Sequence, residues 1–237
     1  MELSVLIDYD NIMPHIQNRG LVYISEGIVD KLEYEEVTPY RRVRMRLYGG
    51  WYEQHYPTRK AHDLETDIQV NFPRRMNITK NGDRHSLIII VEIAYALCID
   101  PRTHLFSTYR PRGIHARLRC HHPNALGCND PSCPLIDVYN FISTGSCNTQ
   151  CCNISSEDMI YRGEQKLVDT MVVCDMIHLA EKEDRVILVS SDDDFWPGIK
   201  TAIIMGTHII HIHTRNRHVP TYYSGNIGQS NYSQRIM

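Results

Sequence analysis

The chain has 237 residues, of which 42% are hydrophobic, and its formal net charge is −3. A chain of this length can bury a full core, and its slight negative charge argues against attraction of the whole molecule to nucleic acid. No apolar run reaches the roughly 18 residues that a membrane span needs, and the chain opens into a strand without a charged leader. We therefore expect a soluble, cytoplasmic protein with no membrane partner. The oligomeric state stays open, and a homodimer is one option.

The N-terminal segments predict strands and a helix. Leu3 to Ile7 is a short apolar run typical of a buried strand, and Ser25 precedes EGIVDKLEYEEV as a helix cap. Val43 to Trp51 alternates apolar and basic side chains before a glycine turn, which favours a second strand. Ile88 to Leu97 is apolar but fits both a strand and a helix, so no element is assigned there.

The last third of the chain predicts a strand, helix, strand unit. Lys166 to Ala180 has apolar residues dense enough for a helix packed on a sheet, and Val186 to Ser190 is a strand. Pro197 suits a first helical turn, Gly206 suits the end of that helix, and Thr207 to His213 forms the next strand. Such units imply a parallel sheet. The predicted fold class is therefore α/β, with a doubly wound, mostly parallel sheet.

Composition divides the chain into three parts. Residues 1–100 and 157–214 carry these elements and form the expected α/β domain. Residues 101–156 lack an apolar pattern and are rich in Pro, Asn, Cys and His, so we expect an inserted subdomain. Residues 215–237 are polar with three arginines, which indicates a flexible tail.

Acidic residues gather where two predicted strands end. Asp8 and Asp10 follow the first strand, and Asp192 and Asp194 follow the strand that ends at Ser190. Ligands of parallel sheets lie at the carboxyl ends of the strands, and grouped carboxylates suit Mg²⁺ or Mn²⁺. Taken alone, each turn is better explained by Asp and Asn side chains that cap backbone donors. Together they favour a divalent metal site.

Four blocks of sequence resemble the NYN branch of the PIN-like nucleases: LIDYDN from Leu6, RLYGGW from Arg46, KLVD from Lys166 and VSSDDDF from Val189. The resemblance implies a PIN-like, Rossmann-like α/β domain. It also implies a metal-dependent nuclease, expected to be an endoribonuclease, that hydrolyses RNA phosphodiester bonds with Mg²⁺ or Mn²⁺.

The resemblance assigns roles to five residues. Asp8 matches the strand-one carboxylate, Asp169 the carboxylate at the start of the central helix, and Asp192 and Asp194 the acidic pair of the later turn. We expect Asp8, Asp169 and Asp192 to bind the metal directly or through water. Asp194 would be a further ligand or position the attacking water, because a bound ion supplies both an activated water and charge compensation. Asn11 would orient a carboxylate or contact phosphate.

Three other acids have weaker assignments. Asp10 stands where the family often has Glu. Asp193 should point away from the site if the backbone there is extended. Asp175 lies six residues after Asp169, about 120° around the helix, which indicates a structural role.

Two alternatives remain open. Asp8 and Asp10 after an apolar run also resemble the nucleophile motif of haloacid-dehalogenase-type phosphatases, in which Asp8 would form an aspartyl-phosphate. Lys166 and the Asp192-Asp193 pair would be the later motifs, but that family expects Thr or Val at the position of Asn11. The second alternative is a non-catalytic NYN module that binds RNA.

Six of the eight cysteines fall between Cys120 and Cys152, which favours a metal over scattered disulfides. We expect a structural Zn²⁺ bound by three cysteines and one histidine, in an insertion with almost no core of its own. The expected ligands are Cys120, Cys128, Cys133 and His122, with His121 or His115 as alternatives to His122. Cys147, Cys151 and Cys152 could replace one ligand or bind a second ion, and the alternative to zinc is a set of free thiols.

Residues 101–119 hold five arginines and no acid, just before this cluster. Arginine binds phosphate bidentately and stacks on bases, so this segment could grip an RNA backbone. The candidate residues are Arg110, Arg112, Arg117 and Arg119. A solvated hairpin explains the same segment nearly as well.

Overall fold

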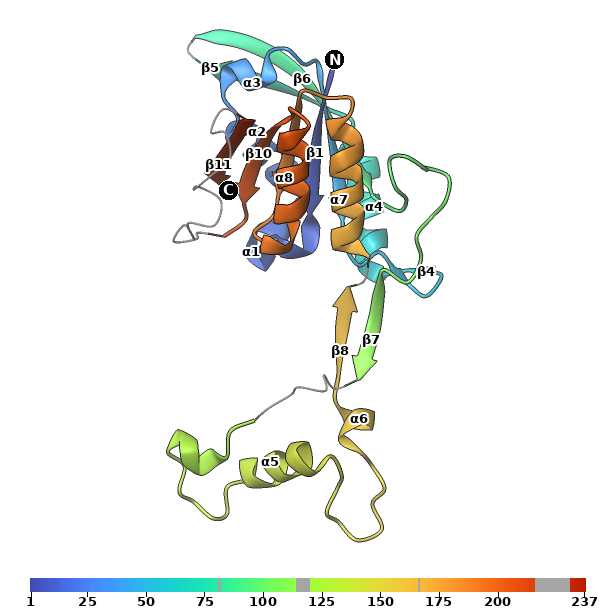
Figure 1. The fold of residues 1–237 in the computed structure, drawn as a ribbon, viewed down its shortest axis with the longest axis vertical. Coiled ribbons are helices and arrows are strands. Elements are labelled where there is room, and N and C mark those ends of the chain that lie inside the picture. The colour runs from blue at the N-terminus through green and yellow to red at the C-terminus, as the bar shows by residue number, and fades with distance from the viewer. Residues whose placement is uncertain (81, 114–119, 166, 216–230) are drawn as a thin grey trace. The chain divides into compact units, whose positions relative to one another are not determined.

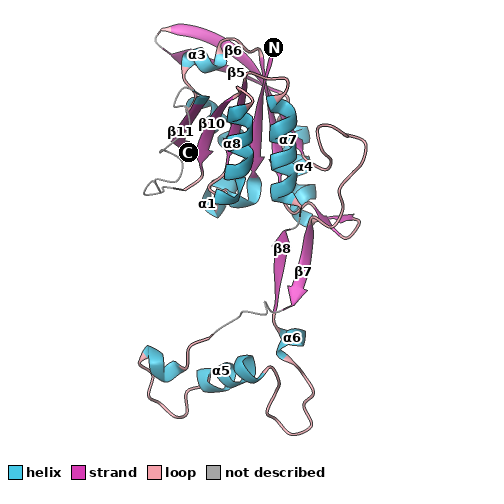
Figure 2. Cartoon of the chain, viewed as in Figure 1, coloured by secondary structure: helices cyan, strands magenta, loops and turns pink. Residues whose placement is uncertain are grey.

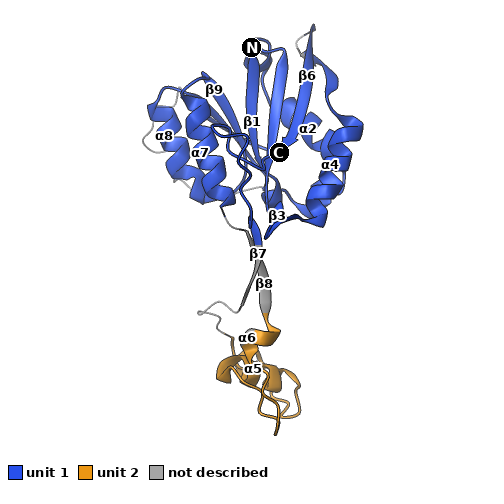
Figure 3. Cartoon of the chain, turned by 90° about the vertical axis from the view of Figure 1, so that its right-hand side faces the viewer, with its two compact units in different colours: residues 1–109, 165–237 blue, residues 110–164 orange. Residues whose placement is uncertain are grey.

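A computed structural model describes residues 1–80, 82–113, 120–165, 167–215 and 231–237 of the chain (Figure 1). The chain divides into two compact units (Figure 3). Unit 1 comprises Met1–Tyr109 and Gln165–Met237, and unit 2 comprises Arg110–Glu164. Within the described ranges, no helix combines the length and the apolar character that crossing a membrane requires.

Unit 1 is built on a seven-stranded sheet with helices (Figure 2). Its strands are β1 (Glu2–Asp8), β2 (Arg42–Tyr48), β5 (Arg74–Lys80), β6 (Asp83–Ile93), β9 (Arg185–Val189), β10 (His208–His213) and β11 (Tyr232–Ile236). Its helices are α1 (Pro14–Gln17), α2 (Gly20–Asp30), α3 (Tyr34–Val37), α4 (Arg59–Asn71), α7 (Val168–Ala180) and α8 (Trp196–Ile204), with short 3-10 turns η1 (Tyr9–Asn11) and η3 (Asp193–Phe195).

A second sheet has the strand order β4-β3-β7-β8. Its strands are β3 (Tyr52–Glu53), β4 (Tyr56–Pro57), β7 (Tyr109–Gly113) and β8 (Tyr161–Gln165). The helices of unit 2 are η2 (Pro123–Leu126), α5 (Leu135–Thr144) and α6 (Ser156–Met159).

The order of the large sheet is β11-β10-β9-β1-β2-β6-β5. Every neighbouring pair is parallel except β5 and β6, which are antiparallel. Without the antiparallel edge strand, the parallel strands follow the order 3-2-1-4-5-6 of a doubly wound sheet. The predicted α/β class with a mostly parallel sheet is therefore confirmed. In this order the chain switches direction between β1 and β9, and ligands bind at the carboxyl ends of such a strand pair.

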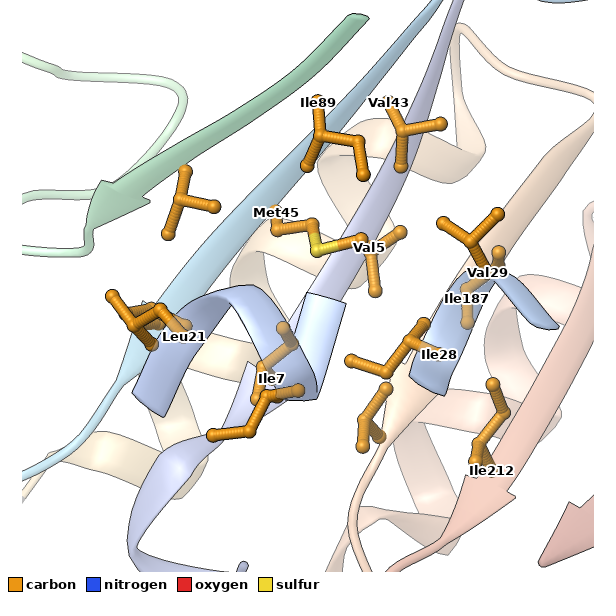
Figure 4. Close-up of a cluster of buried hydrophobic side chains, with 14 of the residues drawn as sticks. Val5, Ile7, Leu21, Ile28, Val29, Val43, Met45, Ile89, Ile187 and Ile212 are labelled. Carbon is orange, nitrogen blue, oxygen red and sulfur yellow. The ribbon is translucent and has the colours of Figure 1, made fainter. Parts of the chain in front are cut away.

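Two hydrophobic cores cover the two faces of this sheet. Alternate side chains of β1 point to opposite faces, so Val5 and Ile7 join the core that contains α2 and α4 (Figure 4). Leu6 joins the core that contains α7 and α8. β9 is divided in the same way, with Ile187 in the first core and Leu188 in the second. Burial on both faces explains why these parallel strands are continuous apolar runs.

Two local predictions needed correction or completion. Ser25 does not cap a helix, because α2 begins at Gly20 and the Ser25 hydroxyl donates to the Val22 carbonyl within it. Of the apolar segment left unassigned, Ile88 to Leu97, residues 88–93 belong to β6, which ends at Ile93.

The expected subdomain began at residue 101, whereas unit 2 begins at Arg110. The difference has a physical reason, because Ala94, Leu97 and Leu105 pack in the second core of unit 1. The expected flexible tail is wrong for the last residues, which form β11 and pair in parallel with β10. The Tyr232 ring packs edge-on against Trp196, with ring centroids 5.8 Å apart. The intervening part of that tail, residues 216–230, lies outside the described residues.

Candidate functional site

The acidic site begins where β1 and β9 end side by side. Asp8 is the last residue of β1, and the residue is 4% exposed. The Ser190 hydroxyl, directly after β9, donates to the Asp8 carboxylate at 2.9 Å. The same hydroxyl accepts from the Asp192 backbone N–H at 3.1 Å. One serine thus joins the end of β1 to the turn that carries Asp192.

Asn11 joins three strand ends. Its side-chain oxygen accepts from the Ser191 N–H at 3.1 Å and from the Thr214 hydroxyl at 2.8 Å. Ser191 follows β9 and Thr214 follows β10, so the turn after β1 is held against both neighbouring turns. The role expected for Asn11 was to orient a carboxylate or contact phosphate. The contacts of its side-chain oxygen show that it positions the backbone that carries the acids.

Asp169 and Asp192 lie within electrostatic reach of Asp8, and Asp192 and Asp194 lie within reach of Asp169. Burial, together with the charges of Asp169, Asp10 and Asp192, raises the pKa of Asp8 to about 7, and the Ser190 hydrogen bond partly opposes this rise. Asp169, in the first turn of α7, has its pKa raised by partial burial and by Asp192 and Asp194. The fold therefore gathers negative charge from three segments, the end of β1, the first turn of α7 and the turn after β9, at one edge of the sheet.

The donor set fits a divalent metal by charge and by ligand type, since hard cations take carboxylate oxygens. The arrangement does not present ready coordination. Throughout the described residues, no group of three or more His, Cys, Asp or Glu side chains is positioned to hold a metal ion. The fit therefore rests on the chemistry of the carboxylates and on the repulsion among them.

The Asp10 side chain points toward the loop after β2. Its carboxylate accepts from the Gly50 N–H at 2.9 Å and forms a short ion pair with the Lys60 ammonium. A Cβ at Gly49 would lie 2.8 Å from the Trp51 ring and 2.9 Å from the Asp10 carboxylate, so the first glycine of YGGW is required for this close approach. Lys60 also lies 4.9 Å from the centre of the Tyr9 ring.

The sequence interpretation missed Ser190, Thr214 and Lys60. Ser190 and Thr214 directly follow strands β9 and β10, so the rule that sites lie at strand ends could have found them. Lys60 had no such signal, because its pairing with Asp10 connects residues 50 positions apart.

The other two acids behave differently. Asp193 is exposed in η3, and it is not among the carboxylates that raise the pKa of Asp8 or Asp169. Asp175 is fully buried and accepts from the Tyr48 hydroxyl at 2.6 Å and from the Cys98 N–H at 2.7 Å. These contacts agree with the structural role predicted for Asp175.

The expected zinc ligands are not gathered in the described part of unit 2. His122 uses Nδ1 to accept from the Asn124 N–H at 3.2 Å, and its ring packs edge-on against Tyr139. The Cys120 sulfur lies 3.6 Å from the Ser143 hydroxyl. Cys128 and Cys133 likewise belong to no group of three or more potential metal ligands among the described residues. The zinc site stays a prediction, and the alternative ligand His115 lies outside the described residues.

The remaining cysteines show one local interaction. Hydrogen bonds with Thr149 and, to a smaller extent, with Cys152 lower the pKa of the Cys147 thiol.

The candidate RNA-gripping arginines are only partly visible. Arg110 and Arg112 belong to β7, and their side chains are not described. Arg117 and Arg119 lie outside the described residues, as does Lys166 of the phosphatase alternative.

Comparisons with protein-family models, with curated proteins and with solved structures give no significant match. The functional argument therefore depends on the residues and geometry of this chain.

Proposed function

We propose that the protein is a metal-dependent ribonuclease of the PIN-like NYN type, with Asp8, Asp169, Asp192 and Asp194 holding Mg²⁺ or Mn²⁺. The observation that carries the proposal is the state of Asp8. It is buried at the switch point of a doubly wound sheet, and burial and neighbouring carboxylates hold its pKa at about 7. Strongly perturbed groups in such a position are typical of functional sites.

The energetics favour a cation. Like charges this close destabilise one another, and a divalent ion would reverse that repulsion. When bound, the metal supplies an activated water and compensates charge on the phosphate. The chain contributes orientation: Ser190 holds the Asp8 carboxylate, and Asn11 with Thr214 fixes the turns. The Lys60 side chain is 40% exposed and adds a positive charge beside the acids, where it would attract phosphate.

Unit 2 enters the proposal as a structural zinc subdomain whose arginines help to hold RNA. Pro123 and Ser156 are among its few buried side chains, and no residue of α5 is buried. A unit with so small a core gains folding free energy from a metal. Metal analysis of purified protein should find about one equivalent of zinc, reduced by Cys128→Ser. A content below about half an equivalent, unchanged in the variant, would count against zinc.

Cleavage of labelled single-stranded RNA with Mn²⁺ tests the acidic site. Asp8→Asn and Asp192→Asn should each reduce the rate at least about 100-fold, because each removes a charge that holds the ion. Asp193→Asn is the matched control, since it removes the same charge from an exposed position in the same turn. EDTA should abolish the wild-type rate.

Three results would redirect the proposal. Equal cleavage by wild type, Asp8→Asn and Asp192→Asn would remove the assigned active site. RNA binding without metal-dependent cleavage would support the non-catalytic module. Turnover of a small aryl phosphate that depends on Asp8, with RNA untouched, would support the phosphatase.

A further inference from the structure

A second charged surface lies on the same sheet, away from the acids. Residues of β2 and β6 with even numbers point to the face of Leu6, because Val43, Leu87 and Ile89 belong to the core on the other face. On the antiparallel edge strand β5, Met76 packs on that other core, so the odd-numbered residues point to the face of Leu6. Five arginines share this face of β2, β6 and β5: Arg42, Arg44, Arg46, Arg75 and Arg84.

Two of these arginines are neutralised. Arg44 bonds to Glu2 at 2.7 Å and to Glu92 at 2.8 Å. Arg46 shares Glu92 at 2.5 Å. Apart from Asp8 in the acidic site, Glu2 and Glu92 are the acids that β1, β2, β5 and β6 place on this face. Both are paired with Arg44 or Arg46.

The other three arginines keep their charge available. Arg42, Arg75 and Arg84 are exposed, and none of them forms an ion pair with any residue that the structure describes. Arg42 and Arg75 both pair in register with Ile88, one from each side, which places their backbones about 10 Å apart across the sheet. Arg84 lies four residues before Ile88 on the same face of β6.

The surroundings of these arginines are polar. Asn77 pairs with Ser86 and Thr79 pairs with Arg84, so amide and hydroxyl groups stand between the charges. Ile88 is 37% exposed, and it is the apolar side chain between Arg42 and Arg75. Guanidinium groups bind phosphates bidentately and stack on unpaired bases, and amides and hydroxyls bond to base edges. This composition suits a single-stranded nucleic acid better than a lipid surface, which needs inserted apolar side chains.

We propose that Arg42, Arg75 and Arg84 form a binding surface for the backbone of single-stranded RNA. The choice of RNA rests on the proposed ribonuclease function. β2 runs from Arg42 to Tyr48, and Tyr48 pairs with Asp8, so the surface lies about 20 Å from the acidic site along the sheet. Since α7 packs on β1 and β2 between the two places, a strand of more than about six stacked nucleotides is needed to join them. The surface therefore holds the part of a substrate that extends beyond the site of cleavage.

Binding without cleavage tests the surface. The affinity for a fluorescent single-stranded RNA of about 12 nucleotides is measured in EDTA, by anisotropy, at several salt concentrations. The Arg42→Ala/Arg75→Ala protein should bind about 10-fold more weakly, and its salt slope should be smaller by about 1.4, or about 0.7 for each lost phosphate contact.

The matched control is Arg74→Ala. Arg74 adjoins Arg75 and is also exposed, but it lies on the opposite face and pairs with Glu26 at 3.2 Å. Its loss should change affinity less than about twofold. Circular dichroism and thermal midpoints verify that all variants are folded. An equal loss in Arg74→Ala, or no loss in the double variant, would overturn the proposal. The proposal would also be overturned if the double variant lost binding to phosphatidylserine vesicles but bound RNA as tightly as the wild type.

Cleavage of a short RNA of about four nucleotides separates this proposal from the ribonuclease proposal, since such an RNA cannot reach the arginines. If no RNA is cleaved and the double variant still binds weakly, the ribonuclease proposal fails and the binding surface stands. If cleavage depends on Asp8 while the double variant binds normally, the site stands and the surface fails.

Discussion

Two buried carboxylates of unit 1 are held in opposite ways. Asp175 has no exposed surface, and it receives hydrogen bonds from Tyr48 and Cys98 and lies 3.5 Å from the Arg46 guanidinium. Asp8 is nearly as buried, yet its charged neighbours include Asp169 and two further aspartates. Burial alone therefore does not distinguish Asp175 from Asp8, the acid that we propose to be functional.

The difference lies in what compensates the charge. The Arg46 guanidinium and two hydrogen-bond donors contact the Asp175 carboxylate, so these contacts strengthen the packing of α7 on β2. Asp8 has the Ser190 hydroxyl, while burial and like charges oppose its ionisation. A protein retains such an unfavourable site where function requires it. Four predictions test this contrast, and the first two have opposite signs.

Asp175→Ala should lower the free energy of unfolding by about 3 kcal/mol, because it leaves Arg46 without one of its charge partners and the buried Tyr48 and Cys98 donors unsatisfied. Chemical denaturation monitored by circular dichroism measures this loss. Asp175→Asn, which keeps an acceptor, should lose less. A loss below about 0.5 kcal/mol for Asp175→Ala would show that the network contributes nothing to stability.

Asp8→Asn should raise the free energy of unfolding. Folding raises the pKa of Asp8 from 3.8 to about 7, so the folded state binds the proton more tightly than the unfolded state. The contribution of protonated Asp8 to the free energy of unfolding is fully present below about pH 4, and it is lost as the pH rises through about 7. The advantage of Asp8→Asn should therefore be about 2.6 kcal/mol larger at pH 8 than at pH 5.

Denaturation of wild type and Asp8→Asn at both pH values measures that difference, with Asp193→Asn as the control for loss of a surface charge. An advantage that is independent of pH would show that Asp8 is already ionised in the apo protein at pH 5. The same measurement serves as a control for the cleavage assay. If Asp8→Asn is more stable than the wild type, unfolding does not explain its loss of activity.

A bound divalent metal should offset the repulsion among Asp8 and its neighbouring carboxylates, which Asp8→Asn reduces by removing one charge. At pH 8, Mn²⁺ at about ten times its dissociation constant should stabilise the wild type by about 1.4 kcal/mol, or roughly 3–5 °C in the thermal midpoint. The shift should be small in Asp8→Asn and intact in Asp193→Asn. Equal shifts in all three proteins would place the ion elsewhere.

Thr214→Val should have the smallest effect, about 1 kcal/mol, because it removes a buried hydroxyl that contacts Asn11 at 2.8 Å and Ser191 at 3.1 Å. Thr201→Val on the exposed side of α8 is the control and should change stability by less than about 0.5 kcal/mol. If Asn11 positions the acidic turns, the rate of RNA cleavage should fall more in Thr214→Val than its stability loss explains.

Much of the central fold was predictable because its signals are local. The strands over Leu3–Ile7 and Val186–Ser190 are apolar because both faces are covered, and Pro197 lies in the first turn of α8 as predicted. Gly206, with φ of +98°, follows α8 as its expected terminator. The end of the chain was not predictable, because β11 is held by backbone pairing with β10, and polar residues pair as readily as apolar ones at a sheet edge.

The site residues divide along the same line. Carboxylates after strands are visible in the sequence, and the order of the strands gathers them. The cysteines and His122 are close in the chain, but no shared core in unit 2 brings them together among the described residues.

The sequence by itself determined that buried parallel strands end in acids at one edge of an α/β sheet, because the apolar runs and the residues after them are local features. Only the tertiary structure decided which acids are compensated. Asp175 obtains its hydrogen bond from Tyr48, 127 residues away, and Asp8 obtains its own from Ser190, 182 residues away. The charge state of a buried carboxylate depends on such distant neighbours, and they become neighbours only when the chain has folded.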